Sequence, residues 1–464
     1  MRARALVSVA LCLSGCAVGP DYRRPALDTP ATYRDSGAKP AAAASAQSLG
    51  EARWWEVFQD PVLQQLIRTA IKQNYDLRIA ATRVLQAQAN LSITRANELP
   101  SANLGAGVLS ERNPKIASAF PAYSARAGEV DLSVIWNLDF WGKYRRETEA
   151  ARATLLASEW GQRAVLSSLV SNVATAYFQL REIDLALEIA NSTRRSREDS
   201  VRLTRVLADH GSASTLDVRQ AEQLLYTAAA TIADLERQRA QQEDALSVLL
   251  GQNPGDIPRG RPLVEQLDLP SVPAGLPSQL LERRPDVREA EENLVAANAE
   301  IGAAKADFFP SISLTGTGGV QSYALNQLFK SPAEMWTASA QVTQPIFHGG
   351  ALRAGLRLAK AEREQMVLTY QQTIQNAFRQ VSDSLIALQK GTELTKQQQL
   401  LTDAAHDADQ LSHVLFEHGG ASYLQVLTSE TNYFAAQLDL AAAQLNERLA
   451  LVQLYNALGG GWSP

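Results

Sequence analysis

Apolar and polar residues along this chain follow two different periods, and each period occurs twice. From Val130 to Leu138 every second residue is apolar, and from Trp336 to Thr343 the alternation returns. A period of two predicts a strand with one apolar face and one polar face. A weaker candidate strand precedes each of them, at Ser101 to Arg112 and at Ser311 to Thr315. We therefore expect two strand pairs.

A long helical pattern follows each strand pair. Residues 142–209 and 349–417 contain no proline, and their apolar residues advance by alternating steps of three and four. That spacing predicts a coiled-coil stripe. A helix over residues 142–209 is about 100 Å long at ~1.5 Å per residue. The stripe consists of Leu166, Leu169, Val173, Ala176, Leu180, Ile183, Leu187 and Ala190 in the first helix, and of Phe378, Val381, Leu385 and Leu388 in the second.

Two shorter helices accompany each long one. The first returns from the end of the long helix, over residues 215–250 and 423–458, after a turn that contains glycine. The second precedes the strands, over 61–97 and 284–307, and Asp60-Pro61 is a typical helix start. Because the returning helix is about half as long as its partner, we expect the second short helix to stack on its end.

The chain contains one sequence unit twice. His210-Gly-Ser-Ala-Ser-Thr-Leu-Asp-Val-Arg-Gln-Ala-Glu222 returns as His418-Gly-Gly-Ala-Ser-Tyr-Leu-Gln-Val-Leu-Thr-Ser-Glu430, at an offset of 418 − 210 = 208. Three shorter matches have similar offsets and the same order. They pair Asn74 to Ala80 with Arg284 to Ala290, Leu99 to Ser101 with Phe309 to Ser311, and Phe140 to Gly142 with Phe347 to Gly349. Together they indicate a duplicated unit of roughly 200 residues.

The first residues are typical of a bacterial lipoprotein signal. Arg2 and Arg4 precede a short apolar stretch, and Leu13-Ser14-Gly15-Cys16 matches the pattern that is cleaved before a lipidated cysteine. Cys16 then becomes the acylated N-terminus. The expected organisation is a signal at 1–15, a lipid-anchored arm at 16–55, repeat one at 56–251, a proline-rich connector at 252–283, repeat two at 284–458 and a tail at 459–464.

Composition argues against several classes of function. Cys12 leaves with the signal and Cys16 is lipidated, so neither a disulfide nor a thiol nucleophile is expected. The net charge is −5, or −5 − 2 = −7 without Arg2 and Arg4, which does not suggest nucleic acid as a partner. The five histidines lack metal-ligand spacing, and no phosphate-binding loop is present. We expect no enzyme, no metal and no cofactor other than the covalent lipid on Cys16.

The number of strands predicts the assembly. No apolar run after the signal approaches the ~20 residues of a membrane helix, so a membrane span must use strands. Four strands cannot close, since the smallest membrane barrels have about eight. Two chains supply about eight strands with a filled bore, and three supply about twelve with room for water. The polar strand face favours a homotrimer. The expected α+β fold is a shared trimeric 12-strand β-barrel, four strands per chain, that continues into a long coiled-coil helical barrel.

Several motifs resemble those of lipidated outer-membrane efflux factors, the TolC/NodT-like family, over essentially the whole mature chain. They are the lipobox with Ala17-Val-Gly-Pro-Asp-Tyr22, Trp54-Trp55, Leu281-Glu-Arg-Arg-Pro-Asp-Val-Arg288, Phe309-Pro-Ser311 and Tyr455-Asn-Ala-Leu-Gly-Gly-Gly-Trp462. The resemblance implies a trimeric channel-tunnel in the outer membrane that extends into the periplasm. Such channels dock a periplasmic adaptor and an inner-membrane pump, usually of the proton-driven resistance-nodulation-division type, and export small toxic molecules such as antibiotics.

The resemblance also implies an aperture that is closed at rest by an iris of second-repeat helices lined with acidic residues. The corresponding residues here are His406, Asp409, Gln410 and His413, which share one helix stripe. We interpret them as polar rings that hold the aperture and favour cations; a plain solvated helix face is the alternative. His413 replaces an acidic residue typical of the family. We therefore expect His413 or His406 to make gating sensitive near pH 6.5, the usual range of histidine.

The two glycine turns are the expected adaptor-docking surface. It comprises His210, Gly211 and Ser212 in repeat one, and His418, Gly419 and Gly420 in repeat two. The near-identity of two turns so far apart in one chain favours docking over the alternative, a plain connection that uses glycine for its backbone freedom.

Other functions are kept as alternatives. A protein or peptide secretion channel would be indicated by a neighbouring peptide-export ATPase gene and a secreted toxin gene. A trimeric adhesin would have its strands at the C-terminus, and a periplasmic adaptor would have one hairpin and globular β domains. Strands that interrupt the helices twice favour the tunnel over both. Copper and silver exporters often use methionines, and only Met335 and Met366 accompany Met1, so those substrates receive little support.

Overall fold

The computed structural model describes residues 17–26, 30, 49–113, 123–265 and 277–462, which form two compact units. The first unit contains 17–26 and the described residues of 83–159 and 289–371. The second contains 30, 49–82, the described residues of 160–288, and 372–462. Each unit therefore draws on both sequence repeats.

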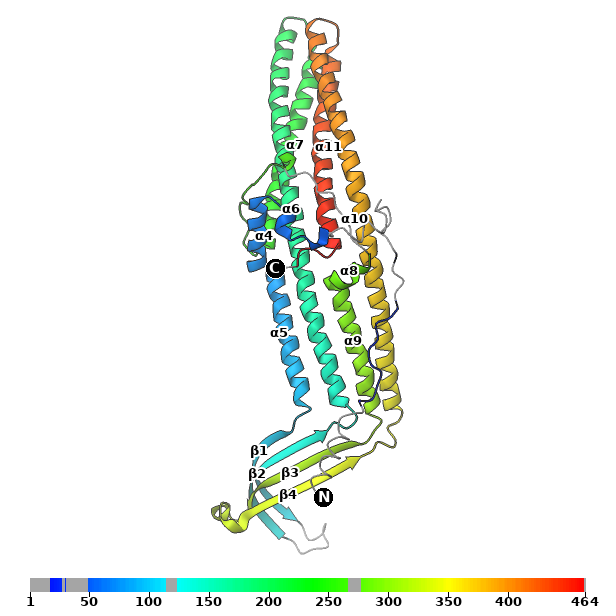
Figure 1. The fold of residues 1–464 in the computed structure, drawn as a ribbon. Coiled ribbons are helices and arrows are strands. Elements are labelled where there is room, and N and C mark those ends of the chain that lie inside the picture. Colours follow the sequence, from blue (N-terminus) through cyan, green and yellow to red (C-terminus); the bar gives the residue numbers. More distant parts are fainter. Residues whose placement is uncertain (1–16, 27–29, 31–48, 114–122, 266–276, 463–464) are drawn as a thin grey trace. The chain divides into compact units, whose positions relative to one another are not determined.

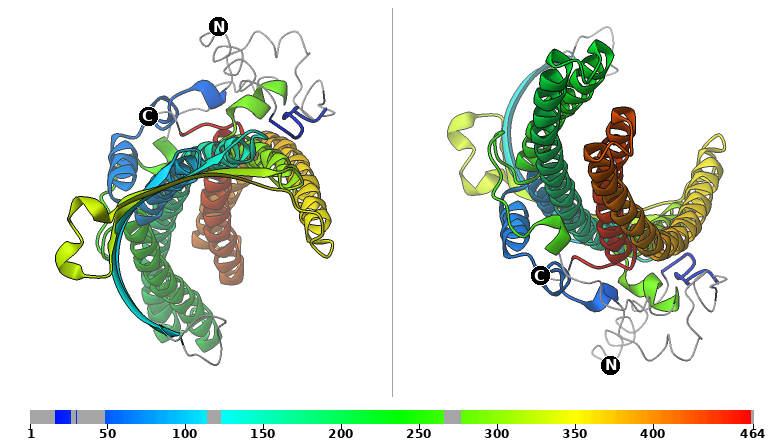
Figure 2. Two further views of the ribbon diagram at one scale, coloured as in Figure 1. Left: turned by 90° about the horizontal axis from the view of Figure 1, so that it is seen from below. Right: turned by 90° about the horizontal axis from the view of Figure 1, so that it is seen from above.

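All four predicted strands are present, in one antiparallel sheet of the first unit (Figure 1). The strands are β1 (Ser101–Asn113), β2 (Tyr123–Leu138), β3 (Ser311–Ser322) and β4 (Glu334–Thr343), and they pair in sequence order. β2 and β3 are longer than the alternation predicted, so the connector expected from Gln321 begins only after Ser322. Two short 3-10 helices, η3 (Leu325–Gln327) and η4 (Ser331–Ala333), join β3 to β4. The sheet curves into an arc (Figure 2).

The strand register gathers apolar residues on one face of the sheet. Val134 pairs with Ala102 and Gly316, Trp136 with Leu314, and Gly318 with Trp336. Because neighbours along a strand point to opposite faces, the residues between them form the other face. That face is mostly polar and contains Asn103, Ser133, Asn137, Ser313, Thr315, Thr317, Thr337, Ser339 and Gln341.

The two long helices and their returning partners are confirmed. They are α6 (Lys143–Asp209) with α7 (Thr215–Leu249), and α10 (Ala351–Glu417) with α11 (Tyr423–Ala457). In α6 the predicted stripe is buried except for the half-buried Leu166. In α10 the prediction was less accurate, because the buried residues around the predicted stripe are Ile374, Ala377, Val381 and Ser384, while Phe378, Leu385 and Leu388 are half-buried.

The single helix predicted over residues 61–97 is wrong: the chain forms α4 (Pro61–Gln73) and α5 (Tyr75–Ala96). The break is Asn74, which has an extended ψ of 132° and is 3% exposed. Its side-chain oxygen accepts the amide of Leu77 at 3.0 Å, and its Nδ2 donates to the carbonyl of Leu249 at 3.0 Å. A side chain that caps one helix and bonds to another holds the break in place.

The stacking of short helices is present in both repeats. The end of α7 meets the α4–α5 break, where Gly251 has a φ of +71° and lies against the backbone of Gln73. The end of α11 meets the break between α8 (Pro277–Arg283) and α9 (Pro285–Ala306), where Arg284 donates to the carbonyl of Ala457 at 3.1 Å. The expected irregular connector at 252–283 therefore ends in a helix, α8.

The second unit is held together by buried aromatic residues. Tyr177 of α6 donates to the carboxylate of Asp60 at 2.7 Å and accepts the amide of Gly260 at 2.9 Å, which fixes the connector. Tyr455 of α11 donates to the carbonyl of Ala52 at 2.9 Å. Nearby lie η1 (Leu49–Glu51), α3 (Trp54–Val57) and η2 (Leu263–Glu265). None of the described helices has the length and hydropathy of a membrane span.

Candidate functional site

The turns that end the two hairpins have the same backbone geometry. Gly211 and Gly419 have φ angles of +78° and +73°, in the left-handed region that favours glycine. The amide of each glycine donates to the carbonyl three residues back, at 3.0 Å in both turns. The next amide donates to the carbonyl five residues back, at 2.8 Å and 2.7 Å. This pair of hydrogen bonds is the Schellman motif, which commonly ends a helix. The two matching glycine turns predicted from the repeat are therefore present.

The turns differ in how the following helix is capped. Ser214 accepts the amide of Asp217 and donates its own amide to that carboxylate at 2.8 Å, which is a capping box for α7. Ser422 makes no side-chain capping bond for α11. The exposed His210 and His418 each donate from Nδ1 to a carbonyl four residues back, at 2.8 Å.

An exposed apolar patch flanks each turn, and its members match between the repeats. We call these residues the tip patches; all are between 51% and 64% exposed. The sequence analysis did not single them out, although the offset of 208 relates all three pairs. They are Leu203, Val206 and Leu216 in repeat one, and Leu411, Val414 and Leu424 in repeat two.

In repeat two, Asp409 and His413 of α10 face Glu430 of α11. The Nε2 atom of His413 lies 3.2 Å from Oε1 of Glu430 and 3.8 Å from Oδ1 of Asp409. The side chain of Glu430 is 8% exposed, and its Oε2 atom has no hydrogen-bond partner among the described residues. Two largely buried carboxylates thus face one imidazole, and the side chain of His413 is 41% exposed. We call these three residues the His413 cluster.

Helix α6 of repeat one contributes to the His413 cluster. The hydroxyl of Ser200 donates to Oε1 of Glu430 at 3.2 Å. Arg197 is 2% exposed, donates to the carbonyl of Leu224 at 2.7 Å, and lies over the ring of Phe434 at 5.0 Å from its centroid. Its positive charge acts on Glu430 through space. The cluster therefore joins three helices of both repeats.

Burial controls the ionisation of this cluster. It raises the pKa of Glu430 and of Asp409 above the ordinary carboxyl range, because desolvation disfavours the charged form. The charge of His413 opposes this rise in both pKa values. Burial likewise lowers the pKa of Arg197. Among the described residues, Arg197 is the buried cation that acts on Glu430 besides His413.

Repeat one has different side chains at the same positions. At the offset of 208, Arg205 corresponds to His413 and Val201 to Asp409. Glu222, the counterpart of Glu430, accepts from Arg205 at 2.6 Å and from Arg219 at 2.7 Å. These hydrogen bonds hold the pKa of Glu222 below its usual range. Repeat one therefore has permanent ion pairs where repeat two has a titratable contact.

The predicted aperture residues separate into two pairs. Asp409 and His413 belong to the His413 cluster. The ring of His406 packs against the ring of Tyr433, with 4.8 Å between the ring centroids. The Nε2 atom of His406 also lies 2.9 Å from the Nε2 atom of the exposed Gln410. Within the described ranges, no group of three or more His, Cys, Asp or Glu residues is arranged to hold a metal ion.

Three residues at this site were not predicted from the sequence: Glu430, which belongs to the cluster, and Ser200 and Arg197, which act on Glu430. They lie on other helices than the predicted stripe, so helical spacing within α10 could not find them. Only Glu430 carried a signal, as the last residue of the long repeated motif.

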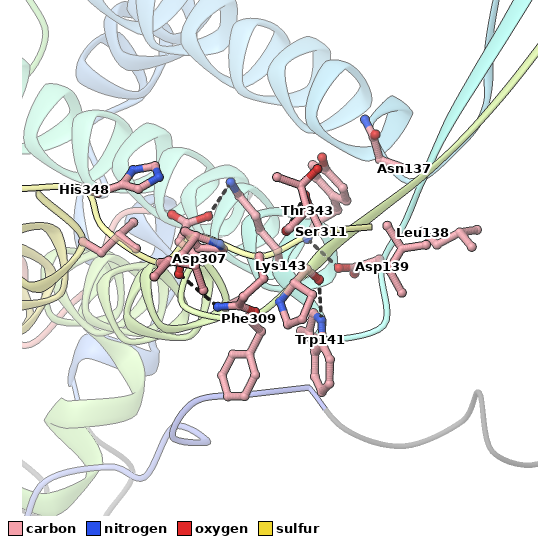
Figure 3. A pocket seen from close by; sticks show the side chains of 18 of the residues that line it. Asn137, Leu138, Asp139, Trp141, Lys143, Asp307, Phe309, Ser311, Thr343 and His348 are labelled. Carbon is pink, nitrogen blue, oxygen red and sulfur yellow. Dashed lines mark hydrogen bonds and ion pairs between the residues drawn. The ribbon is translucent and has the colours of Figure 1, made fainter. Parts of the chain in front are cut away.

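Three of the short repeated motifs contribute to the lining of a cavity of about 620 Å³, where the strands join the helices of the first unit (Figure 3). They are Phe140 to Gly142, Phe309 to Ser311 and Phe347 to Gly349. Trp141 and Phe309 from two of these motifs stack with ring centroids 4.8 Å apart, and Nε1 of Trp141 donates to the carbonyl of Pro310 at 2.8 Å. Lys143 pairs with Asp307 at 2.7 Å beside them. The motifs thus fix the strand–helix junctions.

Cys16, the predicted lipidation site, lies outside the described residues, but the arm that follows it is described from residue 17 to 26. The amide of Val18 donates to the carbonyl of Trp141 at 2.9 Å. Arg24 donates to both carboxylate oxygens of Glu291, at 2.6 Å each. This stretch of the predicted arm is therefore bound along the first unit.

Comparison with known proteins identifies similar chains. A family model described as "Outer membrane efflux protein" matches residues 66–252 and 276–460. The chain is 38% identical over 460 residues to the cation efflux system protein CusC of Escherichia coli O6:H1, covering 98% of this chain and 97% of that protein. It is 39% identical over 461 residues to the solvent efflux pump outer membrane protein SrpC of Pseudomonas putida, with the same coverage. The open state of the Neisseria gonorrhoeae MtrE outer membrane channel matches with a TM-score of 0.88 and 32% identity, over 96% of this chain and 99% of that one.

Proposed function

This chain belongs to the outer membrane efflux protein family, and from that premise we propose that three copies form the outer-membrane channel of a tripartite efflux system. The channel takes small toxic molecules from an inner-membrane pump, of the resistance-nodulation-division type, or from the periplasm and releases them outside. The similar proteins are named for cations and for solvents, so the proposal names a class of substrate and no single compound.

The two-faced sheet is the observation that carries the proposal. Its apolar face suits lipid and its polar face suits a water-filled lumen. Both outer strands, β1 and β4, have one unpaired edge in the single chain. Unpaired backbone groups are too costly in lipid to remain open, so neighbouring copies supply the missing partners. Three copies give a 12-strand barrel with a wet bore, as in the sequence-based expectation.

Matched substitutions on β4 test this assignment. Trp336 and Thr337 are neighbours on opposite faces of the sheet, and Trp336 is 81% exposed in the single chain. Trp336→Arg puts a charge toward lipid at a cost of about 2–4 kcal/mol near the midplane, so we expect little trimer in the outer membrane. Thr337→Arg should assemble normally and alter single-channel conductance in planar bilayers. Equal assembly of the two variants, or a non-conducting wild-type trimer, would refute the proposal.

A lipid on Cys16 fits the bound arm. The contacts of Val18 and Arg24 keep the first described residues of the arm against the first unit, so acyl chains on the preceding cysteine would add a membrane anchor to an already fixed segment. Mass spectrometry of the purified N-terminal peptide tests this: the expected result is an acylated Cys16, and an unmodified N-terminus elsewhere would contradict it.

The helix turns are the proposed docking surface for a periplasmic adaptor. The tip patches support this, because the same three apolar positions flank both turns and expose more than half of each side chain. Gly211→Asp or Gly419→Asp should abolish efflux without preventing trimer assembly, since neither glycine has a neighbour within 4 Å to clash with. Normal drug resistance in both mutants would contradict docking at these turns.

The same ends of the hairpins form the proposed aperture, closed at rest by helices of repeat two. Support comes from the polar stripe of α10, in which His413 contacts Asp409 and also Glu430 of α11, and His406 and Gln410 contact each other. A ring of three such stripes would favour cations. Reversal potentials in a salt gradient test this, because Asp409→Asn should reduce cation preference whereas the exposed Asp439→Asn should not.

A further inference from the structure

Two homologous contacts in this chain respond differently to protons. In repeat one, Glu222 is bound by two arginines, which stay charged at every physiological pH. In repeat two, the corresponding Glu430 is bound by His413, and the counterpart of Arg219 is Leu427. Histidine is the side chain that ordinarily changes charge between about pH 5 and 8. Of the two contacts, only the second contains a side chain of that kind.

Counting charges around Glu430 gives the direction of the change. With His413 neutral, Asp409 and Glu430 carry two negative charges against the single positive charge of Arg197. With His413 protonated, or with one carboxyl protonated, the positive and negative charges of the cluster balance. Because Glu430 is almost fully buried, an unbalanced charge there is costly.

We propose that the His413 cluster is a proton-operated latch, which holds α10 against α11 and α6 at mildly acidic pH and loosens as the pH rises toward 8. The latch concerns packing of the tip; its consequence for conduction rests on the proposed function. In an assembled channel it would make the repeat-two hairpin, and not the repeat-one hairpin, the part of the aperture that responds to protons.

Other ionisable groups also surround the His413 cluster and contribute to its charge balance. From α10, His406 acts on Asp409 with the same sign as His413. From α11, Tyr423 and Tyr433 face the cluster, and burial raises both of their pKa values, so they stay neutral. From α6, Arg197 is the cation and Ser200 is a neutral donor. Asp217 of α7 and Asp403 of α10 act on the two tyrosines. None of these groups supplies a second permanent cation to Glu430.

The sign of the effect follows from linkage. A carboxyl with a raised pKa in the packed state binds its proton more tightly there than in the loosened state. Packing is therefore favoured as the pH falls through that raised pKa, and this contribution is lost as the pH rises through it.

A matched pair of spin labels tests the latch in the purified full-length trimer. Asp199 and Asp407 are exposed counterparts at the offset of 208. A nitroxide attached to p-acetylphenylalanine at position 199 reports on the repeat-one hairpin, and one at position 407 reports on the repeat-two hairpin. Between about pH 5.5 and 8, the ratio of mobile to immobile label at 407 should rise, by at most about tenfold per pH unit for one linked proton. The fraction at 199 should stay constant. No change at 407, or an equal change at 199, would overturn the latch.

Variants separate the latch from general effects of pH. His413→Arg copies repeat one and should remove the change at 407, and so should Glu430→Gln. His348→Gln, an exposed histidine of the other unit, should keep it. If the first two variants misfold, the double variant Val201→Asp/Arg205→His provides the converse test, because it should make label 199 pH-dependent. A pH response at 407 that persists in His413→Arg and Glu430→Gln refutes the proposal, as does an unresponsive double variant.

Conductance measured on the same samples separates this inference from the proposed function. A label response with no change in conductance between the two pH values supports the latch and contradicts its location at the aperture. A trimer that never conducts contradicts the channel proposal, while the spin-label result still decides the latch.

Discussion

The hairpins α6–α7 and α10–α11 end in the same turn, but different side chains lie behind that turn. Gly211 and Gly419 have nearly equal φ angles and the same pair of backbone bonds. Behind them, repeat one pairs Glu222 with two arginines, whereas repeat two pairs Glu430 with one histidine. Duplication has kept the backbone geometry of the two ends while substitutions at three positions changed their electrostatics.

This difference shows that a repeat need not mean two equal parts. Backbone bonds depend only on glycine at the left-handed position, so the turn survives sequence change around it. An ion pair depends on the identity of both partners and on their burial. The two ends therefore share the backbone geometry of the proposed docking surface, while only one of them contains the proposed proton latch.

Loss of Arg197 is expected to give the largest effect and to act on repeat two. At about pH 8, Arg197→Met removes the one buried cation near Glu430, and breaking such a buried arrangement typically costs about 3 kcal/mol. The cost should become smaller as the pH falls, because the raised pKa of Glu430 favours its neutral form and a protonated carboxyl needs no cation. Thermal unfolding of the trimer at about pH 8 and about pH 5.5 measures this. The exposed Arg202→Met is the control, and an equal loss there would refute the role of Arg197.

Substitution of the turn glycines should affect both repeats equally. Gly211→Ala and Gly419→Ala each put a side chain at a positive φ, which costs about 1–2 kcal/mol, with no clash to add because both sites are open. Hydrogen exchange of peptides that span each turn should show the same acceleration in both. Unequal acceleration would mean that the two turns are less alike than their backbone bonds indicate.

The caps that follow the turns should distinguish the repeats. Ser214→Ala removes the capping box of α7 and should cost about 1 kcal/mol. Ser422→Ala removes no side-chain bond and should be close to neutral. Exchange rates in the first turn of α7 and of α11 measure the contrast, and a comparable loss at both serines would contradict it.

Loss of one repeat-one arginine should have the smallest effect. Arg205 is more than half exposed, and Arg219 still binds Glu222 after Arg205→Gln. Exposed pairs contribute little and are screened by salt, so stability in low salt should fall slightly and stability at ~0.5 M salt should not change. A large, salt-independent loss would show that the pair is more important than its exposure implies.

Much of the fold was predictable from the sequence because its periods are long and regular. The long helices appear within a few residues of the predicted bounds, the strands lie where the alternation indicated although β2 and β3 extend beyond it, and the glycine turns lie where the repeat indicated. The break at Asn74 was not predictable, because it depends on a bond from its side chain to Leu249, 175 positions away in sequence. The buried stripe of α10 was also misjudged, since burial there depends on which neighbours pack against it.

The candidate site was predicted only along one helix. Helical spacing found His406, Asp409, Gln410 and His413, but spacing cannot show which residues of other helices face them. Glu430 and Arg197 became part of the site only when α11 and α6 packed against α10.

The sequence by itself determined the elements of this protein, the duplication, the two-faced strands and the family. These are local properties: periods, turn glycines and motif order are all written in residues close together along the chain. Only the tertiary structure decided which charges meet, because ion pairing and burial depend on distances between segments that sequence spacing does not fix. The glutamate that ends the repeated motif is therefore bound by two arginines at Glu222 and by a histidine at Glu430.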